Sequence, residues 1–259
     1  KFADLDQENV RDFFLRMLTS GEISQAFLFA GPKGTGKTSA ARILAMTVNC
    51  QENLKPKGKS LQEPCGVCEQ CVSIRSGTSS SVIEMDAASN RGIDDIRELR
   101  ERIGLMPTGG IYTVYIVDEV HMLTKEAFNA LLKTLEEPPK HVIFCLCTTE
   151  ERKLPDTIVS RCTTVYYKKS SLEEIKRSLQ RVIRGEGLKI DEKAIEYLCK
   201  RADGSFRDGV KVLEQVGNGG EVITLERLTK ELGDSSGELT LKLTNLILGG
   251  NVNEAFVCL

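Results

Sequence analysis

The sequence predicts an α/β protein in which a parallel sheet is followed by a smaller, all-helical part. Three observations carry this prediction. Short apolar runs typical of buried strands alternate with amphipathic helices up to about residue 168. A glycine-rich run that matches G-x-x-x-x-G-K-[ST] joins the first strand to a helix. After residue 168 only helical patterns continue.

Apolar spacing predicts the elements of the sheet-containing part in order. A first helix ends at Gly21, and the apolar run 26–30 predicts a buried strand. The remaining predictions are a helix after residue 38, strands at 82–86, 112–117, 142–147 and 165–167, a helix at about 92–103, and a helix that Pro138-Pro139 ends. Residues 50–76 break the pattern and indicate an inserted, cysteine-rich loop module.

The second part begins with Ser171-Leu172-Glu173-Glu174, which fits a helix capping box. Helices are predicted near 171–184, 191–202, 206–217 and 224–232. The expected domains are therefore a nucleotide-binding domain at 1–168, a helical domain at 169–233, and the opening of a third, truncated helical domain at 234–259.

Composition limits the kind of protein this can be. The formal net charge of −2 argues against a strongly basic nucleic-acid binder, although a local basic patch stays possible. No run approaches the roughly 20 apolar residues that span a bilayer, and no signal-peptide pattern is present. The odd number of cysteines, nine, favours a reducing cytoplasm and a metal site over a disulfide framework.

The glycine-rich run is Gly31-Pro32-Lys33-Gly34-Thr35-Gly36-Lys37-Thr38. Its glycines allow backbone N–H groups to surround a polyphosphate, and the helix that follows directs its positive end at the same anion. Lys37 would contact the β- and γ-phosphates, Thr38 would bind Mg²⁺, and Ser39 is included in the nucleotide-binding set. We therefore expect ATP and Mg²⁺ here.

A second motif, an acidic pair, follows a strand. Residues 114–117 are apolar, and the carboxylates of Asp118 and Glu119 come directly after them. Asp118 would hold Mg²⁺ through its water shell, and Glu119 would orient and activate the attacking water. His121 fits a supporting or packing role better than a catalytic one.

Four cysteines in the inserted module have metal-ligand spacing: Cys50, Cys65, Cys68 and Cys71, as C-x14-C-x2-C-x2-C. Four thiolates suit a closed tetrahedral Zn²⁺ site. The C-x2-C-x2-C run is also typical of iron–sulfur proteins, so both metals stay open on the spacing alone. Cys145 and Cys147 alternate along a strand and are expected in the core.

The motifs resemble those of AAA+ clamp-loader ATPases. The phosphate loop, Asp118-Glu119, Thr148-Thr149, Ser160-Arg161-Cys162 and the segment 204–208 stand in the order found in that family. The cysteines and the segment 86–92 narrow the resemblance to the gamma/tau subunits of the bacterial DNA polymerase III clamp loader. It covers nearly the whole chain, although Leu5-Asp6-Gln7 stands where Val-Gly-Gln is more usual.

The resemblance implies a role for several further residues. Thr149 corresponds to sensor 1, Arg161 to an arginine finger that acts in trans, and Arg207 to sensor 2 on a lid domain. It favours Zn²⁺ for the cysteines and a collar for the third domain. Asn90, Arg91 and Lys125, at two helix starts, are candidates for backbone contact with DNA.

The function implied is an ATP-hydrolysing motor that opens a sliding clamp and loads it onto primer–template DNA together with other clamp-loader subunits. Two alternatives stay open. One is a non-hydrolysing scaffold subunit, against which Lys37, Thr38, Asp118 and Glu119 argue. The other is a different AAA+ motor, such as a helicase loader or branch-migration ATPase, against which the cysteine module argues.

Overall fold

The computed structural model describes residues 1–54, 60–104, 106–107, 110–217, 222–232 and 244–250. The chain divides into two compact units, Lys1–Ser170 and Ser171–Leu259. Most of the truncated domain expected at 234–259 lies outside the described residues.

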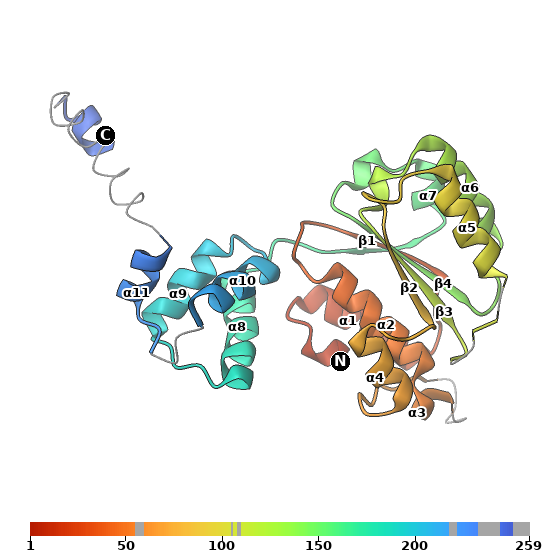
Figure 1. Cartoon of the computed structure of the whole chain (residues 1–259), viewed down its shortest axis with the longest axis horizontal. Coiled ribbons are helices and arrows are strands. Elements are labelled where there is room, and N and C mark those ends of the chain that lie inside the picture. The colour runs from red at the N-terminus through yellow and green to blue at the C-terminus, as the bar shows by residue number, and fades with distance from the viewer. Residues whose placement is uncertain (55–59, 105, 108–109, 218–221, 233–243, 251–259) are drawn as a thin grey trace. The chain divides into compact units, whose positions relative to one another are not determined.

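The first unit is built on a five-stranded parallel sheet (Figure 1). Its strands lie in the order β2-β3-β4-β1-β5. Their bounds are β1 (Ala26–Ala30), β2 (Val82–Asp86), β3 (Thr113–Asp118), β4 (Val142–Thr148) and β5 (Thr163–Tyr166). The parallel sheet predicted from the sequence is therefore confirmed.

The register brings the carboxyl ends of the strands to one edge. Ala30 lies opposite Thr148, and Asp86 lies opposite Asp118. Ligands of open parallel sheets bind outside this edge, where the loops after the strands meet. The sequence motifs after β1, β3 and β4 are thus neighbours in space.

Helices cover both faces of the sheet (Figure 1). One face carries α1 (Glu8–Ser20), α2 (Lys37–Asn49) and α4 (Glu69–Ser76), and the other carries α5 (Ile93–Ile103), α6 (Lys125–Glu136) and α7 (Asp156–Val159). Successive side chains along a strand point to opposite faces of the sheet, so each strand can contribute residues to both cores. Phe27 and Phe29 of β1 pack in the first core, whereas Leu28 packs in the second.

The cysteine module contains more regular structure than the predicted loop. It holds α3 (Gln51–Leu54) and α4, which buries Ile74 in the first core. The carboxylate of Glu63 accepts hydrogen bonds from the backbone N–H groups of Phe2 (2.9 Å) and Ala3 (2.7 Å), in the short 3-10 helix η1 (Phe2–Asp4). The module therefore fastens the first residues to the rest of the unit.

The second unit is a cluster of helices with its own core. It contains α8 (Leu172–Glu186), α9 (Glu192–Arg201), α10 (Phe206–Gly217) and α11 (Leu225–Glu231). The predicted capping box is present, since Ser171 Oγ accepts from the Glu174 N–H and Glu174 Oε2 accepts from the Ser171 N–H. One isolated β-bridge, Ile190 to Ile223, is an addition to the predicted all-helical pattern.

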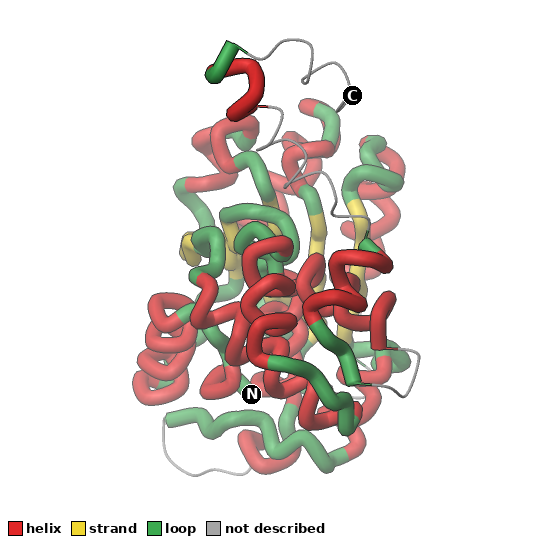
Figure 2. The backbone as a smooth tube through the Cα atoms, turned by 90° about the vertical axis from the view of Figure 1, so that its left-hand side faces the viewer, coloured by secondary structure: helices red, strands yellow, loops and turns green. Residues whose placement is uncertain are grey.

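Figure 2 shows the strands lying side by side and helix as the predominant structure. Within the described parts of the chain, no helix is both long enough and apolar enough to cross a bilayer.

Candidate nucleotide site and metal cluster

The phosphate loop lies where the sequence predicts, between β1 and α2. Gly36 is the N-cap of α2, with φ 96° and no side-chain cap, so the first N–H groups of the helix are available to an anion. Gly31 has φ 151°, and a Cβ there would lie 2.2 Å from the carbonyl oxygen of Tyr167. Only glycine fits this close approach between the loop and the chain after β5.

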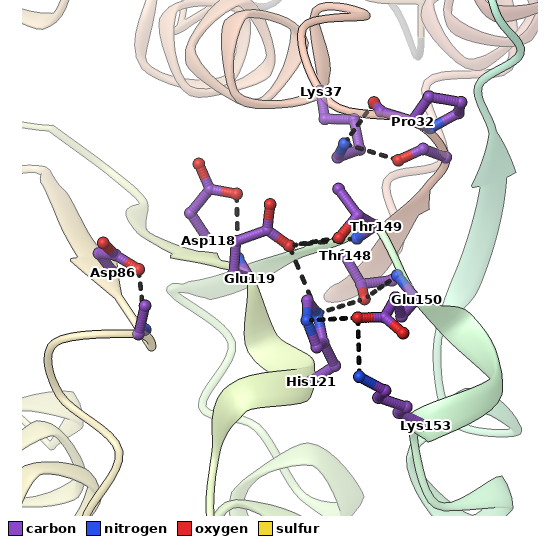
Figure 3. Close-up of polar contacts among 12 residues, drawn as sticks. Pro32, Lys37, Asp86, Asp118, Glu119, His121, Thr148, Thr149, Glu150 and Lys153 are labelled. Carbon is purple, nitrogen blue, oxygen red and sulfur yellow. Dashed lines mark hydrogen bonds and ion pairs between the residues drawn. The ribbon is translucent and has the colours of Figure 1, made fainter.

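The Lys37 ammonium closes the loop. Its Nζ donates to the carbonyl oxygens of Gly31 (2.7 Å) and Pro32 (2.8 Å), and the residue is 6% exposed (Figure 3). These two carbonyls hold the positive charge at the start of α2, beside the helix N-terminus. Ser39 follows on α2 and is exposed.

The structure brings Thr38 and Asp118 together, although they are 80 positions apart. The Thr38 hydroxyl donates to Asp118 Oδ2 at 3.0 Å, and Asp118 Oδ1 accepts from the Glu119 N–H at 3.0 Å. A hydroxyl and a carboxylate are the hard oxygen ligands that Mg²⁺ prefers, so the donor set fits that ion. Asp86, on the neighbouring strand, accepts a hydrogen bond from the N–H of Ala88 at 2.8 Å through its Oδ1.

Glu119 lies against the end of β4. It is one of two described non-glycine residues with positive φ, at 47°. Its Oε2 accepts from the hydroxyl (2.9 Å) and N–H (3.2 Å) of Thr149. Glu119, which the sequence assigns to the attacking water, is thus in direct contact with Thr149, which the resemblance assigns to sensor 1.

His121 extends this network. Its Nδ1 lies 3.0 Å from Thr148 Oγ1 and 3.3 Å from Glu119 Oε2, and its Nε2 lies 3.4 Å from Glu150 Oε1 (Figure 3). A hydrogen bond from Lys153 (2.8 Å) is the main cause of a lowered pKa at Glu150. Sequence reasoning missed Glu150 and Lys153, although both follow directly after the β4 strand signal.

The two arginines that the resemblance selects belong to other elements of the chain. Arg161 follows α7, and its guanidinium donates to Glu136 Oε1 (2.6 Å) and to the Thr157 carbonyl (2.7 Å). Its side chain is about one third exposed, at 34%. Arg207 is exposed in the first turn of α10, in the second unit.

The four predicted cysteine ligands converge. Their Sγ atoms all lie within 4.8 Å of one another; Cys50 and Cys71 are buried, and Cys65 and Cys68 are half-buried. Tetrahedral Zn²⁺ with Zn–S bonds of about 2.3 Å needs sulfurs about 3.8 Å apart, so the cluster fits that ion. Backbone N–H groups of Val67 and Cys68 lower the pKa of Cys65 to about 6, whereas burial raises the pKa of Cys71.

The candidate DNA-contact residues also come together. The Thr124 N–H donates to the Arg91 carbonyl at 3.1 Å, so the starts of α5 and α6 are adjacent. The side chains of Asn90 and Arg91 hydrogen-bond carbonyls of their own turn, at Asp86 and Ala88. Lys125 is exposed at the start of α6.

The fold and the site define a protein of the P-loop AAA+ class. A solved structure of RuvB from Thermotoga maritima, described as a Holliday junction branch migration motor, has the same fold. The TM-score is 0.62, with 93% of this chain and 76% of that chain covered, and the sequences are 19% identical. At that identity the likeness extends to the fold alone.

Sequence comparisons give the family. Residues 6–171 match the model described as DNA polymerase III, delta subunit, and residues 174–219 match the DNA polymerase III clamp loader subunit, ATPase lid domain. The tau subunit of DNA polymerase III from Bacillus subtilis strain 168 is 41% identical over 98% of this chain and 45% of its own length. The Escherichia coli K12 tau subunit is 38% identical over 96% of this chain and 38% of its own length.

The gamma subunit of Buchnera aphidicola subsp. Baizongia pistaciae is 35% identical, over 98% of this chain and 67% of its own length. The chain therefore belongs to the gamma/tau family of DNA polymerase III subunits. It spans less than half the length of the two tau relatives above. The family agrees with the main prediction from sequence rather than with a helicase loader or branch-migration motor.

Proposed function

We propose that this chain is the ATP-binding and ATP-hydrolysing part of a clamp-loader subunit that opens a sliding clamp and loads it onto primer–template DNA. The observation that carries this proposal is the contact between Thr38 and Asp118, at 3.0 Å, because it joins the phosphate loop to the acidic strand end. A cytoplasmic location and assembly with other clamp-loader subunits are part of the proposal.

The chain's own groups have distinct tasks in hydrolysis. The Lys37 ammonium exchanges the carbonyls of Gly31 and Pro32 for the β- and γ-phosphate oxygens of ATP. Thr38 and Asp118 would hold Mg²⁺, which neutralises phosphate charge when bound. Glu119 orients the attacking water and takes its proton, next to Thr149.

Residues outside this group complete the cycle. Arg161 reaches the γ-phosphate held by a neighbouring subunit, and Arg207 senses the nucleotide of its own subunit from the lid. Asn90, Arg91 and Lys125 contact the DNA backbone, an assignment that the adjacency of the α5 and α6 starts supports. Asp94 and Asp95 in the first turn of α5 limit how strongly this surface attracts phosphate.

A non-hydrolysing scaffold is the second candidate. A scaffold has no need for a lysine held in the loop, a hydroxyl on the metal-binding aspartate and a glutamate placed on Thr149. The presence of all three favours the motor.

Hydrolysis by the full-length protein with its partner subunits is expected to rise about 10-fold or more when both sliding clamp and primed DNA are present. Clamp and DNA complete the trans sites by locking subunits together, which is an effect of positioning. Steady-state phosphate release with neither, either or both components measures it. Turnover that ignores both components would contradict the clamp-loading role while leaving the ATPase assignment intact.

We propose Zn²⁺ for the cysteine cluster, where it would tie α2 to the module that fastens the first residues. Natively purified protein is expected to contain one zinc per chain, and Cys71→Ser to lose it. If the site contributes about 2 kcal/mol to the free energy of unfolding, Tm falls by about 4–8 °C. Metal analysis and thermal unfolding measure both.

Cys162→Ser is the matched control, since this half-buried cysteine lies outside the cluster. It is expected to keep the zinc. If the purified protein is brown and contains iron and acid-labile sulfide, the cluster binds an iron–sulfur centre and the zinc assignment is wrong.

A further inference from the structure

We propose that His121 is a positioning residue for Glu119, holding one carboxylate oxygen against Thr149 so that the other faces the attacking water. This inference rests on the proposed ATPase function and deepens it. The observation behind it is that Glu119 has all its polar side-chain contacts on one oxygen.

The two oxygens of Glu119 have different surroundings. Oε2 accepts from the Thr149 hydroxyl (2.9 Å) and N–H (3.2 Å) and lies 3.3 Å from His121 Nδ1. Oε1 has no hydrogen-bond or ion-pair partner among the residues that the structure describes. Figure 3 shows every contact of this carboxylate on one oxygen, with the other turned away from His121. A general base needs such an oxygen, anchored on one side and open to the water on the other.

The backbone explains why this histidine can reach back to this glutamate. Glu119 has φ 47°, which ends β3 abruptly, and the 3-10 helix η2 (Val120–Met122) starts there, closed by the Met122 N–H on the Glu119 carbonyl (2.8 Å). The turn places the imidazole of residue 121 beside the side chain of residue 119. A positive φ is unfavourable for a glutamate, so surrounding contacts must maintain it.

His121 is itself held in place. Its side chain is 6% exposed. Its Nδ1 lies 3.0 Å from Thr148 Oγ1, and this hydroxyl oxygen also accepts a hydrogen bond from the Glu150 N–H. Nε2 faces Glu150 Oε1, which Lys153 holds from the short 3-10 helix η3 (Glu151–Lys153). The titratable groups around the imidazole are therefore Glu119 on its own turn and the Glu150–Lys153 pair after β4. An anchor fixed from both sides suits a positioning role.

The proposal separates turnover from binding. Without the imidazole, Glu119 Oε2 keeps its hydrogen bonds with Thr149 but loses the contact with His121, so the carboxylate can rotate. Misplacement of a catalytic group by about 1 Å can cost about 10²-fold in rate. His121 has no contact with Gly31, Pro32 or Lys37 among the described contacts, so ATP affinity is expected to stay unchanged.

We therefore expect His121→Leu to lower kcat about 10- to 100-fold in the full-length protein assembled with its partner subunits, with the Kd for ATP within about 2-fold of the parent. His121→Asn keeps an amide near the Nδ1 position, which faces Glu119, and should recover most of the loss. His121→Gln keeps an amide near Nε2, which faces Glu150, and should not. Leu, Gln and Asn variants that lose kcat equally would overturn the proposal.

The chain's only other histidine provides a matched control. His141 lies just before β4, at the opposite end of the strand, and its Nε2 is 3.1 Å from the Ile103 carbonyl. His141→Leu is expected to change Tm but not kcat. If it lowers kcat as much as His121→Leu, the effect is one of general stability and the proposal fails.

A double-mutant cycle with Glu119→Gln tests the route. If His121 acts through Glu119, adding His121→Leu to Glu119→Gln changes single-turnover hydrolysis by less than about 2-fold. Full additivity would overturn the proposal. Failure of the proposed function looks different, because a parent complex that does not hydrolyse ATP would show no rate for His121 to affect.

Discussion

Replacing Lys37 with alanine is expected to weaken ATP binding at least about 30-fold, equivalent to about 2 kcal/mol. A hydrogen bond to a charged partner contributes about 1.5–3 kcal/mol, and Lys37 would make such bonds to two phosphates. The ammonium is already in place, because the carbonyls of Gly31 and Pro32 hold it at 2.7 and 2.8 Å. Equilibrium binding of a fluorescent ATP analogue to the purified protein measures the loss.

Two further variants sharpen this test. Lys140→Ala removes one positive charge from an exposed site after Pro139 and is expected to bind ATP like the parent. Lys37→Arg keeps the charge but replaces a compact ammonium by a planar fork, and should bind weakly as well. Tight ATP binding by Lys37→Ala, in a protein that unfolds at the parental temperature, would remove the phosphate-loop assignment.

The sheet could be predicted because its signals are local. The three central strands, β3, β4 and β1, are largely apolar runs ended by a polar or glycine residue, and all strands of a parallel sheet present their carboxyl ends at one edge. That rule alone puts the loop at Gly31, the acidic pair at Asp118 and the threonines at Thr148 in one place, which is where the register has them. The four cysteines converge for a comparable reason, since two CxxC steps already bring three thiolates together.

What the sequence did not predict depends on contacts between distant segments. Nothing local indicates that Glu63 would bind the N–H groups of Phe2 and Ala3, about 60 positions away. No local pattern distinguishes Glu150 in the loop after β4, and only the turn at Glu119 gives it a histidine to face. The helix α4 is not predicted because it adds a single residue, Ile74, to the first core, which is too little to produce a helical apolar pattern among the cysteines.

The second large effect is expected at Arg161. Arg161→Ala should leave ATP affinity unchanged and lower hydrolysis in the assembled complex about 10³-fold or more at each site that depends on it. The reason lies in where the guanidinium points: its partners are Glu136 and the Thr157 carbonyl, and none of its described contacts is to the phosphate loop of its own chain. A surface arginine of this kind can exchange one carboxylate for a phosphate of a neighbouring subunit.

Three controls make the Arg161 result decisive. Arg161→Lys keeps the charge without the two-pronged geometry and should recover little activity. Arg152→Ala, an exposed arginine nine positions earlier, should hydrolyse ATP like the parent. A monomer of this chain should hydrolyse ATP slowly whether or not Arg161 is present, because a finger supplied in trans has no phosphate to reach. Unchanged turnover of the Arg161→Ala complex, or fast turnover by a proven monomer, would show that each subunit hydrolyses ATP without help from its neighbour.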